Sequence, residues 1–292
     1  MTSAVPVPDA DEARLLVRGD DRPGIVAAVA SVLSEAGANI ISMAQHSSAE
    51  EPRRFHQRTV FHLPELALRQ DALRADLQKR LGDELGLAWW LVEAAKPKRV
   101  AILVSKADHC VLDLIGRQRR GEILMDIPLV IGNHPDLADH VRYLGVPFVH
   151  LPVTKETKAE VEAEQLRLLQ GNVDVVVLAR YMQVLSGDFL ERVGVPVINI
   201  HHSFLPAFIG ANPYQRAKER GVKLIGATAH YVTDDLDEGP IIEQDVARVT
   251  YQDTAQELRL LGAHVERQVL SRAVRWHCEE RVLRDGNATV IF

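Results

Sequence analysis

From residue 99 onward, short apolar runs rich in β-branched residues alternate with helical stretches. The runs span Val100–Val104, Ile127–Ile131, Val173–Leu178 and Val195–Ile200, and the helical stretch Lys155–Gln170 precedes the third. Nearly continuous apolar strands separated by helices are typical of a parallel sheet that is covered on both faces. The pattern therefore predicts an α/β fold with a doubly wound, mostly parallel sheet. A C-terminal helix at about 254–277 and a short tail strand are expected to follow.

A different order of elements precedes this part. Strands are expected at Leu15–Val17, from Ile40, up to Leu63 and at Leu87–Val92, with helices at Ile25–Gly37 and at Leu68–Leu81, the latter stopped by Gly82. The order βαββαβ predicts a small ferredoxin-like α+β domain. We therefore divide the chain into a domain at 1–94, a polar linker at 95–98 and a second domain at 99–292.

Composition limits the class of protein. The 292 residues are 47% hydrophobic, carry a formal net charge of −6, include no basic tract and contain two cysteines. These values disfavour a nucleic-acid surface and a disulfide scaffold, and Cys110 is expected to be a buried thiol rather than a nucleophile. Residues 1–12 lack a signal-peptide pattern, and no apolar run reaches the length of a membrane helix. We expect a cytoplasmic protein without nucleic-acid or membrane partners.

The run of residues 199–206, Asn-Ile-His-His-Ser-Phe-Leu-Pro, follows a short apolar strand. Asn199 and His201 are two residues apart, so their side chains should share one side of the strand at its carboxyl end, where open α/β sheets bind ligands. Asp237 follows in an acidic turn that Gly239-Pro240 closes. An amide and an imidazole can donate to the oxyanion that forms on an attacked formyl carbon, and a carboxylate can relay protons. An isolated Asn-x-His would more often cap backbone groups.

The match is longer than these three residues. Asn-Ile-His-x-Ser-x-Leu-Pro-x-Phe-x-Gly spans Asn199–Gly210, and Gly226–Val232 and Leu236–Pro240 follow. Over about residues 99–276 the chain resembles formyltransferases that use 10-formyltetrahydrofolate. The resemblance implies that Asn199, His201 and Asp237 are catalytic. It also implies that the residues around the 178–186 segment and the acidic turn bind the folate: Met182, Gln183, Val184, Leu185, His230, Thr233 and Asp234.

Residues 13–94 resemble the ACT regulatory domain, through Asp-Arg-Pro-Gly-Ile-Val and the later Gly37-Ala38-Asn39-Ile40. The resemblance implies an amino-acid effector, glycine or methionine first, at a turn that leads into a helix N-terminus. The expected regulatory residues are Asp21, Arg22, Pro23, Gly24 and Asn39. The alternative is that Asp21 only caps the helix and Gly24 only permits the turn. The edges of a four-stranded sheet also favour pairing between subunits, in a dimer or tetramer.

The loop after the first strand of the second domain indicates the acceptor of the formyl group. In glycinamide ribonucleotide transformylases this loop is rich in glycine and serine and holds a phosphate, whereas residues 105–110 read Ser-Lys-Ala-Asp-His-Cys. This loop offers no glycine, and Asp108 would repel a phosphate, although Lys106 could still bind one.

With the ACT-like domain and His202, this loop resembles formyltetrahydrofolate deformylases. These are hydrolases of a linear amide C–N bond that release formate and tetrahydrofolate, balance the one-carbon folate pool and supply formate for purine synthesis. An amine formyltransferase and a non-catalytic folate-responsive protein remain the alternatives, and methionyl-tRNA formyltransferase is a poorer match.

Three further histidines lie near the predicted site. Lys106, His109 and His202 are expected to belong to an active-site loop, and His230 to orient Asp237 or the folate. Clustered histidines can bind zinc, but consecutive His201 and His202 should point in different directions if the strand continues. We therefore expect no metal and no cofactor besides the folate substrate.

Overall fold

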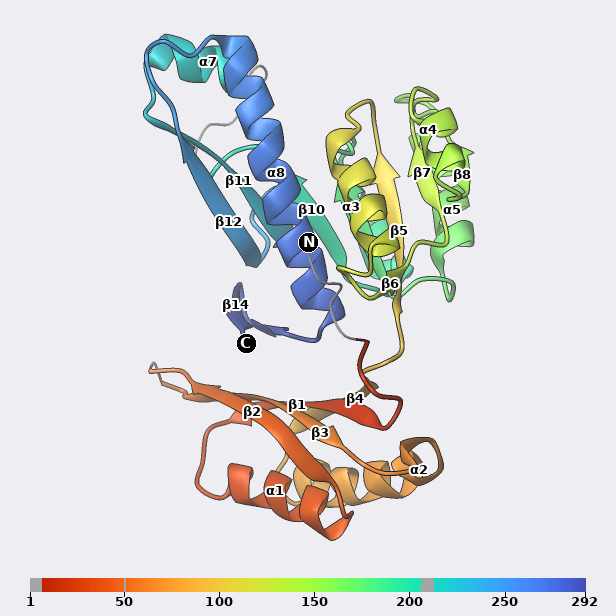
Figure 1. The fold of residues 1–292 in the computed structure, drawn as a ribbon, viewed down its shortest axis with the longest axis vertical. Helices are drawn as coiled ribbons and strands as arrows, with labels where there is room; N and C mark the ends of the chain where they lie inside the picture. Colours follow the sequence, from red (N-terminus) through yellow and green to blue (C-terminus); the bar gives the residue numbers. More distant parts are fainter. Residues whose placement is uncertain (1–6, 50, 206–212) are drawn as a thin grey trace. The chain divides into compact units, whose positions relative to one another are not determined.

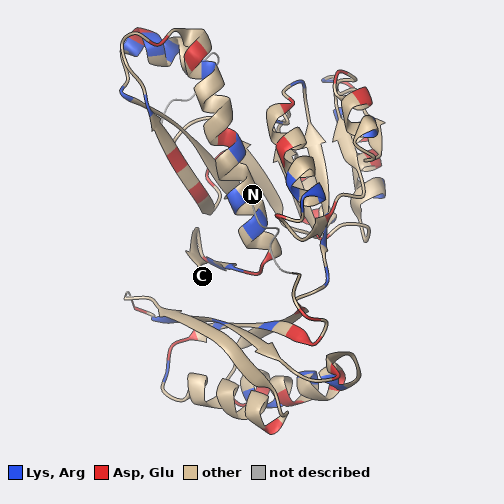
Figure 2. Cartoon of the chain, viewed as in Figure 1, with Lys and Arg blue, Asp and Glu red and all other residues tan. Residues whose placement is uncertain are grey.

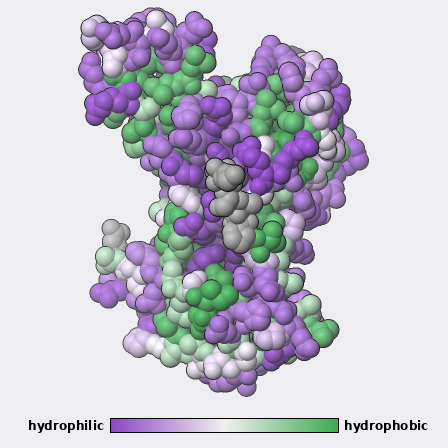
Figure 3. Space-filling model, in the orientation of Figure 1, coloured by the Kyte–Doolittle hydropathy of each residue, from purple (hydrophilic) through white to green (hydrophobic). Residues whose placement is uncertain are grey.

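A computed structural model describes residues 7–49, 51–205 and 213–292, and the chain divides into two compact units (Figure 1). The small unit comprises the N-terminal part through Pro97 together with Glu279–Asp285 and Thr289–Phe292. The large unit contains Lys98–Cys278 and Gly286–Ala288. Lys and Arg are interspersed with Asp and Glu in both units (Figure 2). The visible surface is mostly hydrophilic, with apolar patches on each unit (Figure 3).

The small unit has the predicted βαββαβ order. Its elements are β1 (Glu12–Asp20), α1 (Ile25–Glu35), β2 (Asn39–Ser47), β3 (Arg54–His62), α2 (Leu66–Leu77), the π-helical turn η1 (Gln78–Asp83) and β4 (Ala88–Glu93). The sheet is antiparallel with the order β2-β3-β1-β4. Apolar residues of α1 recur at helical spacing and pack into the core beneath the sheet, with Ile25, Val29 and Leu33 buried.

The second helix of the small unit runs past the predicted stop at Gly82. The turn η1 contains Gly82 and continues to Asp83, because Leu81 is drawn into the core. The chain leaves the helix at Gly86, whose φ of 62° is left-handed, and the Leu87 N–H donates to the Leu81 carbonyl. This bond pattern is that of a helix end with a left-handed glycine. The helical turn therefore ends at Asp83, one residue past the predicted stop, and Gly86 follows in the turn that leads to β4.

The opposite face of this sheet receives the C-terminal segment. Phe61 faces the helices, so the alternation of side chains places Arg58 on the other face. The Arg58 guanidinium donates to the carbonyls of Glu279 (2.8 Å) and Glu280 (2.9 Å). The segment forms two paired strands, β13 (Val282–Asp285) and β14 (Ala288–Ile291), where the sequence predicted only one.

The large unit contains the predicted mostly parallel sheet, with the order β12-β11-β10-β9-β5-β7-β8 and the short β6 beside β5. The pairs β10-β11 and β11-β12 are antiparallel, and the other neighbouring strands are parallel. The elements are β5 (Lys98–Val104), α3 (His109–Arg119), β6 (Met125–Asp126), β7 (Val130–Gly132), α4 (Ala138–Tyr143), β8 (Phe148–His150), α5 (Lys158–Leu169), β9 (Val175–Ala179), α6 (Gly187–Val193), β10 (Val197–His201), α7 (Pro213–Arg220), β11 (Leu224–Tyr231), β12 (Ile241–Arg248) and α8 (Ala255–Cys278).

Helices cover this sheet and leave the carboxyl ends of its central strands for the site. Leu166 of α5 and Phe189 of α6 pack with Leu103 of β5 in one core cluster, whereas α3 and α8 contact each other (Figure 1). The predicted strand at 127–131 is interrupted at Pro128, which has no N–H for a sheet, so β6 and β7 replace it. In the described part of the chain, no helix is both long and apolar enough to cross a bilayer.

Candidate active site

Two side chains of β10 open the site. Asn199 and His201 are half-buried and line the same cavity of about 690 Å³, as their spacing on one strand predicts. The strand lies inside the sheet, between the parallel β9 and the antiparallel β11. Its carboxyl end is therefore flanked by strands on both sides. The matched motif continues to Gly210, but Pro206, Phe208 and Gly210 lie outside the described residues.

Asp237 lies in the turn after β11, in the left-handed region with φ 59°. Its Oδ2 is 3.1 Å from Nδ1 of His201, and its Oδ1 is 3.6 Å from Nε2 of His230. The hydrogen bond with His201, followed by that with His230, holds the pKa of the Asp237 carboxyl well below its usual range. Asp237 is therefore an ionised carboxylate at neutral pH.

His230 connects Asn199 to Asp237. Asn199 on β10 and His230 on β11 are register partners. The His230 ring is buried, and its Nδ1 is 3.0 Å from the Tyr231 carbonyl, so Nδ1–H donates there. Its Nε2 is 3.2 Å from the Asn199 amide nitrogen. A neutral ring accepts from that amide, whereas a protonated ring donates to Asp237. His230 therefore lies between the Asn199 amide and the Asp237 carboxylate.

The wall of the cavity beside β9 is an apolar loop. The side chains of Met182 and Val184 are 60% and 57% exposed, which is unusual for adjacent apolar groups. The loop is held at both ends, because the Met182 N–H donates to Oγ of Ser105 (2.9 Å) and Ser186 donates through its N–H and hydroxyl to Glu162. The structure brings all the predicted folate-binding residues to this cavity: Met182, Gln183, Val184, Leu185, His230, Thr233 and Asp234.

His202 also lines the cavity, but not as expected from an extended strand. The rings of His201 and His202 are stacked, with centroids 5.1 Å apart and planes 22° apart. The expectation that the two rings point in different directions held only for a strand that continues, and β10 ends at His201. Burial, the Arg180 charge and the His201 charge lower the pKa of His202 to about 4. His202 is therefore neutral at pH 7.

The comparisons with known proteins agree with this geometry. The formyl transferase family model matches residues 98–274, and the ACT domain family model matches residues 13–75. The chain is 62% identical over 97% of its length to a formyltetrahydrofolate deformylase of Mycobacterium tuberculosis, covering 91% of that relative, and 50% identical over 97% to the Bacillus subtilis protein of the same name, covering 94%. The chain belongs to the formyltetrahydrofolate deformylase family.

Solved structures agree. A formyltetrahydrofolate deformylase from Burkholderia mallei superposes with a TM-score of 0.91 at 43% identity, covering 97% of this chain and 99% of that one. A glycinamide ribonucleotide transformylase from Symbiobacterium toebii has a TM-score of 0.63 at 32% identity, with 68% of this chain and 95% of that one covered. The predicted deformylase family, its hydrolase class and the two predicted types of domain are confirmed.

This deformylase-family chain has a buried charged cluster beside the cavity that the sequence did not reveal. Glu266 of α8 is only 2% exposed, and its Oε2 is 2.8 Å from Nε2 of His109 and 3.5 Å from Nε of Arg180. Its Oε1 accepts a hydrogen bond of 2.8 Å from the Tyr214 hydroxyl. Arg180 also lines the cavity, whereas His109 and the exposed Lys106 are not among its lining residues. Of the predicted loop residues, only His202 borders the cavity.

Donor atoms of His109, Cys110 and Glu266 lie within 4.8 Å of one another, a spacing that a metal ion could use. The guanidinium of Arg180 lies beside the same carboxylate and would repel a cation. Burial, followed by the charge of Glu266, raises the pKa of the Cys110 thiol, so it stays protonated and is a poor ligand. The chemistry of this group suits an internal ion pair better than a metal centre.

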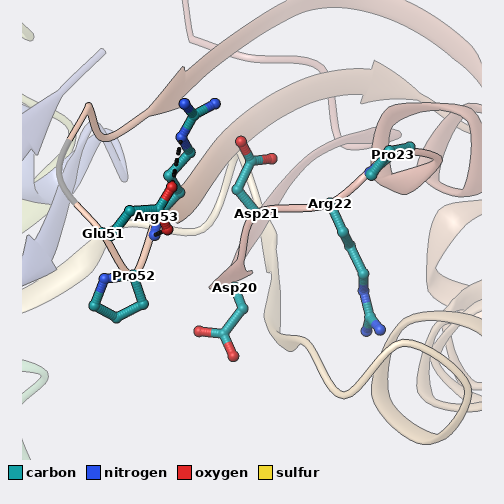
Figure 4. A pocket seen from close by; sticks show the side chains of 7 residues that line it. All are labelled: Asp20, Asp21, Arg22, Pro23, Glu51, Pro52 and Arg53. Carbon is teal, nitrogen blue, oxygen red and sulfur yellow. Dashed lines mark hydrogen bonds and ion pairs between the residues drawn. The ribbon is translucent and has the colours of Figure 1, made fainter.

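A second cavity, of about 580 Å³, lies in the small unit (Figure 4). The predicted regulatory residues Asp21, Arg22 and Pro23 line it on one side, and Glu51–Arg53 line it on the other. Gly24 caps the N-terminus of α1 with φ 96°.

Asn39 does not reach this cavity. It pairs with His62 at one end of β3, whereas Asp20, which borders the cavity, pairs with Arg54 at the other end. Helix α1 spans the distance between the turn and Asn39. Within one chain, the two parts of the predicted regulatory pocket therefore do not meet, and the turn before β3 takes the place that we assigned to Asn39.

Proposed function

We propose that this chain hydrolyses 10-formyltetrahydrofolate to tetrahydrofolate and formate, with Asn199, His201 and Asp237 as the catalytic group. The observation that carries the proposal is the contact of 3.1 Å between His201 and Asp237 on the wall of a cavity that Asn199 also lines. Membership in the deformylase family supports the same reaction.

The chemistry assigns a role to each side chain. Water adds to the formyl carbon, and the resulting oxyanion is held by the Asn199 amide and by His201, whose Nδ1–H is committed to Asp237 so that Nε2 is left for the substrate. Asp237 orients the water and takes its proton. The C–N10 bond then breaks as N10 takes the proton that Asp237 accepted, and the formic acid, which carries the oxygen of the water, loses its remaining proton to solvent and leaves as formate. Two donors aimed at one oxygen are the main catalytic contribution.

The apolar loop supports a folate. We propose that the pterin packs against the exposed side chains of Met182 and Val184 while backbone groups of this loop bind its polar edge, and that Thr233 and Asp234 border the other side. Ser105, Glu162 and Gln165 fix the loop, the last by donating to the Tyr181 hydroxyl (2.9 Å), so little conformational entropy is lost on binding.

Water is the acceptor in this proposal. The loop after β5 contains no glycine between Ser105 and Cys110, so it does not offer the flexible backbone that wraps a phosphate. His109, the first residue of α3 directly after that loop, is directed to the buried Glu266. This loop therefore offers a phosphorylated amine the charge of Lys106 but no glycine backbone that wraps a phosphate.

The test is a product balance. The purified protein is incubated with 10-formyltetrahydrofolate alone, and formate and tetrahydrofolate are measured; equal amounts are expected. Adding glycinamide ribonucleotide should not divert the formyl group from formate. A requirement for an amine acceptor would instead support the formyltransferase alternative, and the absence of any turnover would support a non-catalytic folate-responsive protein.

We further propose that the small unit binds a small amino acid, glycine or methionine first. The cavity beside the N-terminus of α1 is lined by the bases Arg22 and Arg53 and the acids Asp20 and Asp21, and Arg53 also pairs with Glu51 (Figure 4). Coupling to hydrolysis should be about 1–3 kcal/mol. Titration calorimetry with each amino acid tests this proposal, and the absence of heat would argue against it.

We also propose that these domains pair between subunits in a dimer or tetramer, because β2 and β4 are unpaired edges of the sheet within one chain. Deleting residues 1–94 should then reduce the number of subunits per particle, as measured by sedimentation. An unchanged number of subunits would contradict pairing through this domain.

A further inference from the structure

Arg180 is a charged group that the catalytic mechanism does not use. It directly follows β9 and lies in the left-handed region with φ 63°, a conformation that is uncommon for arginine. It is the one lysine or arginine among the described residues that line the folate cavity, which it shares with His201 and His202. The side chain is 19% exposed, so a cation borders the reaction centre from a largely buried position.

The buried Glu266 anchors this guanidinium but does not need it for hydrogen bonding. Both carboxylate oxygens of Glu266 already have partners, His109 and Tyr214, each at 2.8 Å. Arg180 Nε lies 3.5 Å from the carboxylate as an ion pair. Burial alone would raise the pKa of Glu266, but the His109 hydrogen bond and the Arg180 charge outweigh burial and lower it. Glu266 is therefore an ionised counter-charge that fixes the position of Arg180.

The hydrogen-bonding capacity of Arg180 is incompletely used. Its Nε and Nη1 atoms are buried and have no hydrogen-bond partner in the described part of the protein. A buried donor without a partner typically costs about 1–3 kcal/mol, so such groups are usually retained for a ligand or a function. Arg180 lines the cavity and therefore combines a fixed charge, a left-handed backbone and two buried donor atoms without a hydrogen-bond partner among the described residues.

We propose that Arg180 is a carboxylate subsite that receives the formate product beside His201 and His202. This inference rests on the proposed hydrolysis. Hydrolysis converts an uncharged formyl group into an anion, whereas transfer to an amine leaves a neutral formamide. Only the hydrolase therefore needs a cation for a small planar carboxylate, and a guanidinium fits one with two parallel hydrogen bonds. His202 is neutral at pH 7 because its pKa is lowered to about 4, so it can border the anion without a second charge.

The experiment measures formate on the full-length protein in two ways. Initial rates with 10-formyltetrahydrofolate are recorded with increasing sodium formate against sodium chloride of equal ionic strength, and formate is also titrated calorimetrically without folate. The variants are Arg180→Met, Arg180→Lys and the control Arg192→Met. Arg192 is a surface arginine of α6 that pairs with Asp188 and does not line the cavity.

Formate should inhibit the wild type and the Arg192→Met variant equally. Arg180→Met should weaken inhibition and calorimetric binding by roughly tenfold or more, the effect of losing a charge-assisted bond, and by more than it changes the KM for the folate. Arg180→Lys keeps the positive charge but loses the paired N–H groups of the guanidinium. Its formate affinity should therefore lie between those of the wild type and Arg180→Met. Nitrate, a planar anion of similar size, should compete with formate. If Arg180→Met does not fold, the Arg180→Lys variant decides by the same comparison.

Two results would overturn the subsite: a wild type insensitive to formate beyond chloride, and folded Arg180 variants with unchanged formate affinity. The failure of the proposed hydrolysis looks different. In that case no formate is released from the folate, yet the calorimetric binding of added formate still disappears with Arg180→Met.

Discussion

The phenol of Tyr214 occupies the space that a side chain on residue 262 would need. A Cβ on Gly262, in the middle of α8, would overlap the Tyr214 hydroxyl and ring. This close approach lets the hydroxyl reach Oε1 of Glu266, one helical turn further along α8, at 2.8 Å. A glycine inside a helix is usually unfavourable by about 1 kcal/mol relative to alanine. Here it is the condition for the hydrogen bond from Tyr214 to the buried Glu266.

The first prediction concerns that glycine. Gly262→Ala should destabilise the protein although alanine favours helices, because the phenol must move and Glu266 loses a partner. The control is Gly116→Ala in α3, where a new Cβ would meet only the end of the flexible Arg120 side chain. Urea unfolding should give a lower free energy of unfolding for Gly262→Ala and an equal or higher one for Gly116→Ala. Equal values for both variants would show that the Tyr214 contact does not matter.

The second prediction concerns the catalytic group. Asn199→Ala, His201→Ala and Asp237→Asn should each reduce kcat by about two to three orders of magnitude, the usual cost of one oxyanion donor. Since the three act together, double variants should be little worse than single ones. Circular dichroism checks folding. Near-normal turnover in folded Asp237→Asn would remove Asp237 from the mechanism.

Much of this site was predictable because strand geometry is local. Asn199 and His201 are two residues apart on an apolar strand, so their shared side and their place at the sheet edge follow from alternation alone. The buried cluster was not predictable in this way. Glu266 lies on α8 and Arg180 after β9, and no spacing in the sequence relates them. The only local signal was a charged residue on the apolar face of a helix, where Val265 and Val269 are buried.

In the fold, too, local patterns were predictable and contacts between distant segments were not. The alternating strands and helices predicted both domains, but not where the last residues of the chain would go. Arg58 reads in the sequence as a surface residue of a strand, yet it is paired with carbonyls more than two hundred positions away. Asn39 was misplaced for a related reason, because a motif beside it suggested a site while α1 carries it away from the turn. Contacts between distant segments depend on packing that a linear pattern does not contain.

The third prediction tests the C-terminal segment on the small unit. Arg58→Met leaves the carbonyls of Glu279 and Glu280 without these two hydrogen bonds, at a cost of about 1–3 kcal/mol. Hydrogen exchange of residues 279–292 should increase, while exchange in β10 should not change. Arg53→Met, an exposed residue that pairs with Glu51, is the control and should leave both unchanged. Unaltered exchange of the segment in Arg58→Met would mean that other contacts hold it.

The fourth prediction follows from the protonation of His202. Its pKa is lowered from 6.5 to about 4, chiefly by burial, so between these values the unfolded chain binds a proton that the folded chain does not. The free energy of unfolding must therefore fall as the pH drops from 6.5 toward 4. His202→Asn should reduce this fall in urea titrations at pH 7 and pH 5, whereas His140→Asn on the exposed surface of α4 should not. An unchanged difference between the two pH values would contradict a buried, neutral His202.

The fifth prediction concerns the effector turn. Gly24 has φ 96°, and a Cβ there would meet nothing within 4 Å, so Gly24→Val acts through backbone strain of about 1–3 kcal/mol rather than by filling the cavity. The strained turn should no longer present the N-terminus of α1, and the response to the amino acid should disappear while basal hydrolysis stays largely intact. Gly145→Val, at φ 74° and equally open in the large unit, imposes similar strain elsewhere and should keep the response. If Gly145→Val also loses the response, general destabilisation explains the effect; if Gly24→Val keeps it, the effector does not use this turn.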